Sequence, residues 1–242
     1  MNYFDCNVIA GWIRNGLVEY KPVDILHLMD KAGIKSALCA SSTGYQSNDV
    51  IANNITYEMA KKDPRLISVG TIHPTRYFNV EEEISKRKEQ GFKAFRLFTE
   101  FYEVNFDSFQ MKEYFHVLDK YKIPLIVSST DIQLNSNYLE GIARRASEVS
   151  IPVIVLNVSG YRLGSAIPCA KAVENLYFGT RLIYTNRALE LLCEKLGSER
   201  LLLASGIPYF YAMQSIQYIN MADISDKDRT NILGDNLRRI LK

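Results

Sequence analysis

The feature of this chain that most constrains its fold is an alternation between short apolar runs and amphipathic helical stretches. The runs PLIVSS and PVIVLNV are apolar at nearly every position, which is typical of strands buried on both faces of a parallel sheet. The pattern predicts strands over residues 2–8, 36–40, 66–72, 94–98, 124–128, 152–158, 176–183 and 201–205. It predicts helices over residues 23–31, 49–62, 80–90, 106–121, 137–149, 166–174, 187–196 and 209–221.

Eight strand–helix units in a chain of 242 residues predict an α/β fold, a parallel (β/α)8 TIM barrel, for which about 250 residues is typical. A doubly wound open sheet is the alternative, and the number of units favours the closed barrel. The chain contains no Pro/Ser/Gly-rich linker, charge block or low-complexity tract. We therefore expect one domain over residues 1–242.

Composition narrows the classes of partner and the compartment. A net charge of +2 gives no reason to expect nucleic acid or an anionic membrane. No apolar run approaches the roughly 20 residues of a membrane span, and the first residues do not resemble a signal peptide. The four cysteines are widely spaced and form no CxxC pair, which fits a reduced cytoplasmic protein. The sequence is also compatible with a homo-oligomer.

In a barrel of this kind, ligands bind where the strands end, at the C-terminal face. Polar residues fall at these predicted strand ends, and we expect them to contact a small-molecule ligand: Asp5, Asn7, His73, Arg96, Ser128, Asn157 and Ser205.

Arg96 is the most informative of these residues. It lies in the alternating run FKAFRLF, and burying a charged side chain in a barrel strand is expensive unless it is paired. Two interpretations stay open. Arg96 forms an internal ion pair with Asp5 or Glu100, or it anchors a carboxylate or phosphate group of a ligand.

Several segments, in order along the chain, carry a family resemblance. The opening strand reads FDCNVI, where the family has an apolar-Asp-x-His-x-His strand. DPRLISVGTIHP resembles the segment around the third strand of the family, RLLLASGIP stands where the family has Arg-x-x-x-Gly-Ser-Asp-x-Pro, and the tail ILGDNLRRIL resembles its closing helix. From end to end, the chain resembles the amidohydrolase-related, TIM-barrel metal-dependent hydrolases, and this resemblance implies the same fold.

The resemblance also implies where metal ligands would lie. Members of the family bind divalent cations through two His of the first strand, a His after the fifth, a His after the sixth and an Asp after the eighth. The metal activates a water molecule, and the Asp takes its proton. The matching positions in this sequence are Asn7, Ile9, Ser128, Asn157 and Gly206. None is a good zinc ligand, and His27 and His116 lie on predicted helices, so we expect no metal and no cofactor.

Other residues at the strand ends could replace the metal as an acid/base pair, because general acid–base catalysis needs only a positioned group of suitable pKa. The candidates are Asp5, His73, Glu100 and Asp131. Each has a structural alternative. For Asp5 we favour a role in orienting the backbone near the first strand. His73, which precedes Pro74, is more simply a loop residue, and Glu100 and Glu103 are most simply solvated loop charges.

Three classes of function remain. The first is an amidohydrolase-like protein without the catalytic metal, which binds a small anionic metabolite at the barrel mouth. The second is a metal-independent hydrolase, lactonase or decarboxylase, which requires a titratable group of shifted pKa close to Arg96. The third is a non-catalytic subunit or scaffold, which requires a large apolar surface patch.

Overall fold

The computed structural model describes residues 2–13, 17–76, 79–102, 104–128 and 136–242. The acid/base candidate Asp131 and the loop residue Glu103 lie outside these ranges, and the side chain of the candidate Glu100 is not described either.

The sheet contains nine strands in the order β2-β1-β3-β4-β5-β6-β7-β8-β9. β1 and the strands β3 to β9 pair in parallel with their neighbours, whereas β2, at the edge of the sheet, pairs antiparallel with β1. The strands are β1 (Tyr3–Ile13), β2 (Val18–Tyr20), β3 (Ile34–Ser41), β4 (Leu66–Thr71), β5 (Ala94–Phe98), β6 (Leu125–Ser128), β7 (Val153–Val155), β8 (Leu176–Gly179) and β9 (Leu201–Leu202).

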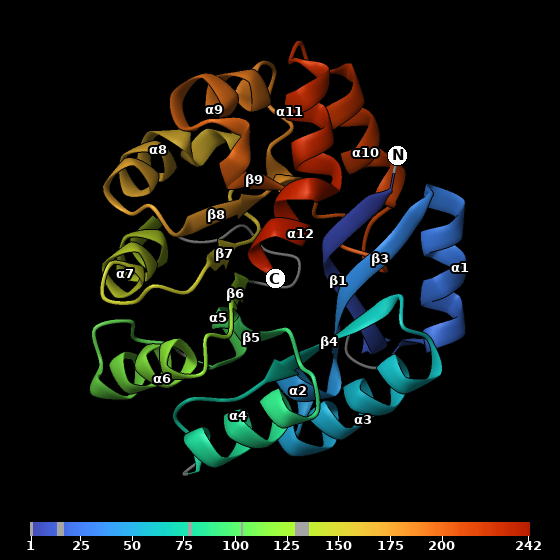
Figure 1. Ribbon diagram of the computed structural model, residues 1–242, viewed down its shortest axis with the longest axis vertical. Coiled ribbons are helices and arrows are strands. Elements are labelled where there is room, and N and C mark those ends of the chain that lie inside the picture. Colours follow the sequence, from blue (N-terminus) through green and yellow to red (C-terminus); the bar gives the residue numbers. More distant parts are fainter. Residues whose placement is uncertain (1, 14–16, 77–78, 103, 129–135) are drawn as a thin grey trace.

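The sheet closes on itself between the segment that follows β9 and β1. The amide of Cys6 donates to the carbonyl of Leu203 at 2.9 Å, and the amide of Ile9 donates to the carbonyl of Ile207 at 3.0 Å. The helices form a ring around this closed sheet (Figure 1). The predicted TIM barrel is therefore confirmed.

Each predicted helix is present, α3 with the predicted ends and the others with shifted ends, and short additional helices occur. The helices are α1 (Pro22–Ala32), α2 (Thr43–Gln46), α3 (Asp49–Lys62), α4 (Val80–Glu89), α5 (Thr99–Tyr102), α6 (Phe109–Lys120), α7 (Ser136–Ala146), α8 (Leu163–Ala172), α9 (Ala188–Leu196), α10 (Ala212–Met221), α11 (Asp226–Thr230) and α12 (Asn236–Ile240). The predicted start of helix α6 at Phe106 was wrong. Helix α6 begins after Ser108, whose hydroxyl accepts a hydrogen bond from the amide of Met111 at 3.3 Å and caps the helix.

The predicted end of the first strand was also wrong. β1 continues beyond Val8 to Ile13 because its second half pairs with β2 in a hairpin, with Gly11 opposite Tyr20. β2 has only three residues, too few to give a detectable alternation. The hairpin extends beyond the ends of the other strands.

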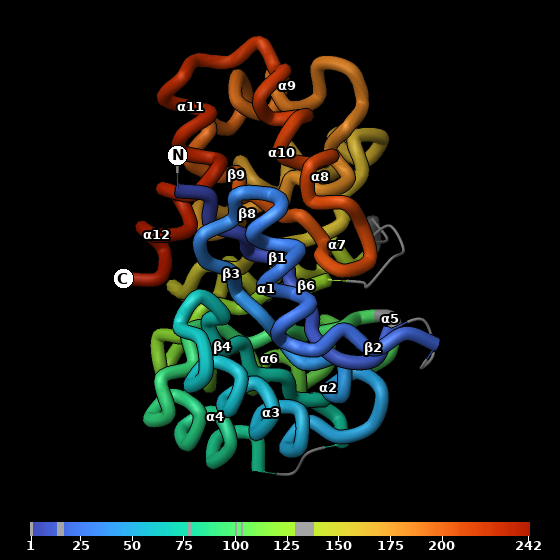
Figure 2. Tube along the Cα trace, turned by 90° about the vertical axis from the view of Figure 1, so that its right-hand side faces the viewer, coloured from blue at the N-terminus to red at the C-terminus, as the bar shows by residue number. Residues whose placement is uncertain are grey.

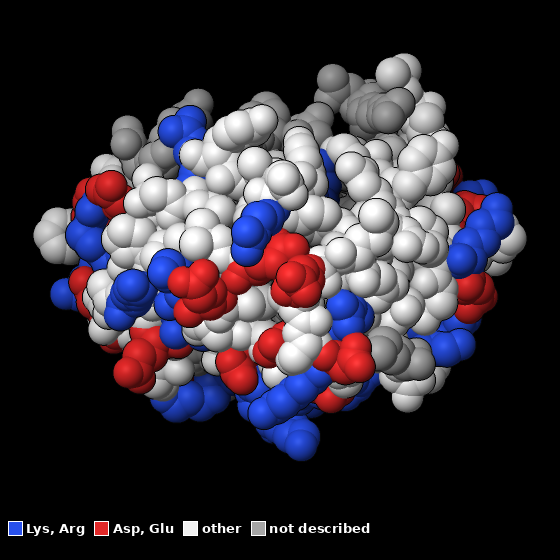
Figure 3. All heavy atoms as spheres, turned by 90° about the horizontal axis from the view of Figure 1, so that it is seen from above, with Lys and Arg blue, Asp and Glu red and all other residues white. Residues whose placement is uncertain are grey.

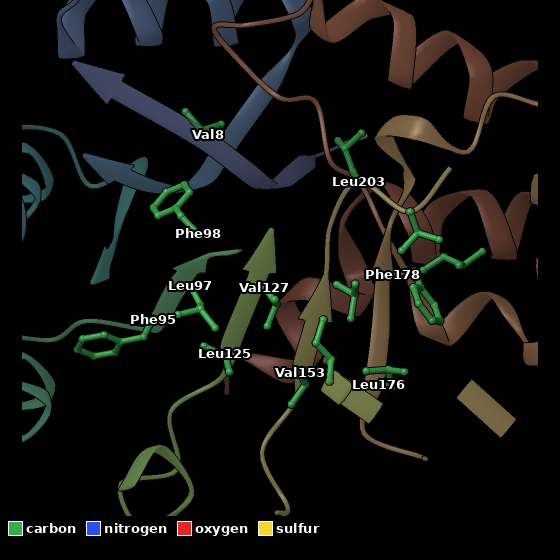
Figure 4. Packing of buried hydrophobic residues seen from close by; sticks show 14 of the residues in the cluster. Val8, Phe95, Leu97, Phe98, Leu125, Val127, Val153, Leu176, Phe178 and Leu203 are labelled. Atoms are coloured by element: carbon green, nitrogen blue, oxygen red, sulfur yellow. The ribbon is translucent and has the colours of Figure 1, made fainter. Parts of the chain in front are cut away.

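Side chains alternate between the inside of the barrel and the helix layer, as expected for strands of a closed sheet. On β6, Leu125 and Val127 pack in the large cluster between strands and helices, whereas Ile126 packs in the smaller inner cluster. Figure 4 shows members of the large cluster, among them Leu97, Val127 and Val153, on the successive strands β5, β6 and β7. The inner cluster includes Leu237 of α12.

The two ends of the barrel differ in what covers them. Helix α12 lies over the centre of the ring in Figure 1, and both termini lie at that end of the molecule in Figure 2. β2, α2 and α5 lie toward the opposite end, where the parallel strands finish (Figure 2). We call this opposite end the mouth.

Charges on the surface are mixed. Acidic and basic side chains lie interspersed on the face shown in Figure 3. Within the part of the chain that is described, no helix has both the length and the apolar character needed to cross a membrane.

Candidate functional site

Arg96 lies inside the barrel, near the mouth. It is two residues beyond Ala94, which packs in the inner cluster, and the period of two places both side chains on the inner face. Arg96 is 2% exposed, and its Nε donates a hydrogen bond to the Ser128 hydroxyl at 2.8 Å. Its Cζ lies 4.7 Å from the centre of the Phe98 ring. The predicted residues Arg96 and Ser128 are thus in contact.

A second buried arginine, which the sequence analysis missed, lies beyond β8. Arg181 is 6% exposed, and its Nη1 donates a hydrogen bond to Oδ1 of Asn157 at 2.9 Å. Its Cζ lies 3.2 Å from the centre of the Phe210 ring, a close cation–π contact. The sequence contains an indication that Arg181 faces the inside of the barrel, because it follows Tyr177 and Gly179 at the spacing of two that places residues on one face of a strand.

These four polar side chains come from four consecutive strands of the barrel. Arg96 lies on β5, Ser128 ends β6, Asn157 follows β7 and Arg181 follows β8. Two strands lie between those of the arginines: Arg96 reaches toward β6 and Arg181 reaches toward β7. The two guanidinium groups therefore lie on one arc of the mouth, and we call the four residues the arginine arc.

Two residues beside the Arg181 side chain, one after β7 and one after β9, have left-handed backbone conformations. Asn157 has φ of 63° and Gly206 has φ of 76°. Asparagine tolerates this region better than most residues, and glycine adopts it without steric cost. A Cβ atom at Gly206 would lie 2.7 Å from Cδ and 2.9 Å from Nε of Arg181. The Arg181 side chain thus fills the space that a side chain at position 206 would need.

Asp5 and Ser205 join the two strands at which the barrel closes. Oδ1 of Asp5 accepts hydrogen bonds from the amides of Asn7 at 2.9 Å and Ser205 at 3.0 Å, and Oδ2 accepts one from the Ser205 hydroxyl. Burial raises the pKa of the Asp5 carboxyl, although these hydrogen bonds and the charge of Arg96 oppose the rise. This position agrees with the structural role favoured for Asp5. Its role in ligand binding stays a prediction.

His73 lies in a different part of the mouth. Its amide donates to Asp49 at 2.8 Å, and its ring lies 4.3 Å from the ring of Tyr102, centre to centre. His73, Asp49 and Tyr102 line a cavity of about 190 Å³ between α2, α3 and α5. Of the predicted site residues, only His73 is among the described residues that line this cavity.

The five positions matched to metal ligands have diverse surroundings. Ser128 and Asn157 accept hydrogen bonds from the two guanidinium groups. The carbonyl of Asn7 accepts a hydrogen bond from the amide of Gly206 at 3.1 Å, and Ile9 packs in the large hydrophobic cluster. Within the described ranges, no three His, Cys, Asp or Glu side chains gather closely enough to hold a metal ion. His27 and His116 lie on α1 and α6, as predicted.

The family model described as Amidohydrolase, Amidohydro_2, matches residues 20–242 of the chain. The protein therefore belongs to the amidohydrolase family. No curated protein sequence matches it.

Solved structures share the fold. A 2,6-dihydroxybenzoate decarboxylase in complex with 2,6-dihydroxybenzoate superposes with a TM-score of 0.77 at 14% identity, over 100% of this chain and 99% of its own. The 5-carboxyvanillate decarboxylase of Sphingomonas paucimobilis gives 0.76 at 14% identity, over 99% and 98%. A probable 2-pyrone-4,6-dicarboxylic acid hydrolase of Acinetobacter baumannii, with citric acid bound, gives 0.75 at 14% identity, over 100% and 99%. At these identities the likeness establishes the fold alone.

Proposed function

We propose that this protein binds a small anionic metabolite at the barrel mouth and uses no catalytic metal there. The observation that carries the proposal is the position of the buried guanidinium of Arg96, which lies on the inner face of the barrel near the mouth and donates from Nε to the Ser128 hydroxyl. A buried arginine is the side chain best suited to recognise a carboxylate or phosphate, because its planar fork of donors matches both.

The residues at the matched metal positions do not fit a divalent cation. Gly206 and Ile9 have no side-chain donor atom, and the oxygen atoms of Ser128 and Asn157 are bonded to guanidinium groups. A cation placed beside those groups would meet like charge in a poorly solvated environment. An anion would meet opposite charge there.

The names of the similar structures support an anionic ligand. One contains 2,6-dihydroxybenzoate and another contains citric acid, and both ligands carry carboxylate groups. The chain also covers nearly the full length of these proteins, in accord with one domain over residues 1–242. Four free cysteines support a reducing compartment such as the cytoplasm.

A metal-independent decarboxylase or hydrolase is the second candidate, and Asp5 is the observation in its favour. Its pKa is raised by burial, and it lies close enough to Arg96 for the two charges to interact. Against it, both oxygens of Asp5 accept hydrogen bonds from the backbone or from Ser205, which ties the carboxyl to the closure of the barrel. We therefore propose binding as the function that the site supports best.

The test is calorimetric titration with 2,6-dihydroxybenzoate and citrate, with resorcinol as the matched probe that lacks the carboxylate. We expect at least one carboxylate to bind and resorcinol not to bind. Arg96→Met should weaken binding about tenfold to a hundredfold, the worth of one hydrogen bond to a charged group. Arg144→Met removes an exposed arginine paired with Asp107 and serves as the control with unchanged binding.

Three results would contradict the proposal. The first is carboxylate binding that Arg96→Met leaves unchanged, and the second is no binding of either carboxylate to the wild-type protein. The third is about one equivalent of zinc, manganese, iron or nickel per chain, found by elemental analysis of untagged protein and retained through dialysis.

A further inference from the structure

Arg96 is covered by aromatic rings on the side of the mouth. Because its side chain is only 2% exposed, a ligand can reach the guanidinium group only if neighbouring side chains move. Phe98 is the next inward-facing residue of β5 toward the mouth, and its ring centre lies 4.7 Å from Cζ of Arg96. The ring of Tyr45, in the short helix α2 that follows β3, lies 4.9 Å from the Phe98 ring, centre to centre. The two rings thus lie one after the other outward from Arg96.

Tyr45 is joined to a second segment of the mouth. Its hydroxyl forms a hydrogen bond with the hydroxyl of Tyr209, which follows β9. In the closed barrel, β1 lies between β3 and β9, so this bond passes across the end of β1. The next residue, Phe210, packs its ring on Arg181. We call the bonded pair of Tyr45 and Tyr209 the tyrosine bridge.

A cavity lies beside each ring of the tyrosine bridge. Tyr45 lines the cavity of about 190 Å³ that His73 also lines. Tyr209 lines another cavity, of about 380 Å³, between α1 and residues 207–213. A side chain that is close-packed on every side cannot change its rotamer without displacing its neighbours, whereas a ring beside a cavity can. Both rings of the bridge therefore have room to turn away from each other.

The backbone that carries Tyr45 is held on both sides of this residue. The carbonyl of Gly44 accepts a hydrogen bond from the Tyr102 hydroxyl at 3.2 Å. The side-chain amide of Gln46 donates to the carbonyl of Trp12 at 2.7 Å. Opening at this point is therefore a rotation of the Tyr45 ring and not a displacement of α2, and the hydrogen bond between the two hydroxyls opposes it.

We infer that the tyrosine bridge is a gate through which a small molecule reaches Arg96. While the bridge is closed, Tyr45 is held against Phe98, which covers Arg96. When the hydrogen bond breaks, the Tyr45 ring turns into the cavity beside it and opens a path to the guanidinium group. This inference rests on the proposed function for the identity of the ligand that passes, but not for the gate itself.

The experiment uses phenylglyoxal, a small dicarbonyl compound that modifies arginine side chains and requires no bound ligand. We expect Tyr45→Phe and Tyr209→Phe each to increase the rate of Arg96 modification about twofold to tenfold, the effect of losing one neutral hydrogen bond. The double variant should react no faster than either single variant, because all three lose the same bond. Tyr211→Phe changes an exposed tyrosine of the same segment and is the control with an unchanged rate. Peptide mass spectrometry measures the modification of each arginine.

Two other arginines distinguish a gate from general unfolding. Arg144 is exposed and should be modified rapidly in every variant, whereas Arg87, which is 0% exposed in the helix layer, should stay unmodified. The gate is refuted if Arg87 and Arg96 become reactive together, or if Arg96 of the wild-type protein reacts as fast as Arg144.

The tyrosine variants give the remaining outcomes. The gate is also refuted if both single variants modify Arg96 at the wild-type rate, or if the double variant shows the product of the two single increases, because the hydroxyls then act separately. If the wild-type protein binds neither carboxylate but the modification of Arg96 depends on the two hydroxyls as expected, the proposed function fails and the gate stands.

Discussion

Buried arginines occur in two regions of this protein, and their partners differ. In the helix layer, Arg87 of α4 is 0% exposed, and its Nε donates to the carboxylate of Glu83 at 2.6 Å. At the mouth, the hydrogen bonds described for Arg96 and Arg181 end on a hydroxyl and an amide. The first arginine is neutralised within its own helix and holds α4 against α3. The arginines at the mouth donate to Ser128 and Asn157, side chains from neighbouring strands, at the end of the barrel where we propose that a ligand binds.

The largest loss of stability is expected when the ion pair of Glu83 and Arg87 in the helix layer is broken. Glu83→Gln removes the negative charge beside Arg87 and leaves a buried positive charge uncompensated, which costs about 3–5 kcal/mol. We expect the free energy of unfolding, measured with urea, to fall by that amount. Arg96→Met should cost about 1–3 kcal/mol, because it removes the hydrogen bond to the buried Ser128 hydroxyl.

An equal or larger loss of stability in Arg96→Met than in Glu83→Gln would contradict the comparison, because Arg96 would then be a structural residue. A double variant, Glu83→Gln with Arg87→Met, is the control. It removes both charges and should recover part of the stability that Glu83→Gln loses.

A smaller, pH-dependent effect concerns Asp5. Burial raises the pKa of its carboxyl above the value of 3.8 expected for an exposed Asp. A group with a raised pKa in the folded state stabilises the fold below its unfolded pKa, and this stabilisation is lost as the pH rises through the folded pKa. We therefore expect the wild-type protein to lose stability relative to Asp5→Asn between pH 4 and pH 7, in urea unfolding at both pH values. A difference that is constant over this range would show that Asp5 has an ordinary pKa.

The smallest expected effect is a difference in reactivity between cysteine thiols in the strands of the barrel and a cysteine thiol in the helix layer. Cys6 and Cys39 are buried in β1 and β3, and burial raises the pKa of Cys39 to about 12 and that of Cys6 as well. Cys169 of α8 is only half-buried. Because the thiolate is the reactive form, iodoacetamide at pH 8 should modify Cys169 first and Cys6 and Cys39 only after unfolding. Peptide mass spectrometry measures the order, and early labelling of Cys39 would contradict it.

Much of the architecture follows from local sequence. The alternation of apolar runs and amphipathic stretches sets the order of strands and helices, because a strand or helix can be recognised from the period of its own residues. The same period in FKAFRLF places Arg96 inside the barrel. The hairpin of β1 and β2 was missed, because β2 is too short to show a period.

The partners of each buried charge were decided only by the tertiary structure. The sequence left Asp5, Glu100 and a ligand as alternatives for Arg96, whereas the strand register places β6 beside β5 and brings Ser128 to its Nε. Arg181 depends on Gly206, 25 positions farther along the chain, for its space and on Phe210 for its ring contact. These contacts follow from the pairing of neighbouring strands, β5 with β6 and β8 with β9, and closure of the barrel brings the segment after β9 alongside β1. The sequence alone thus determined that this barrel contains a charge near its mouth, and the folded chain determined which groups surround it.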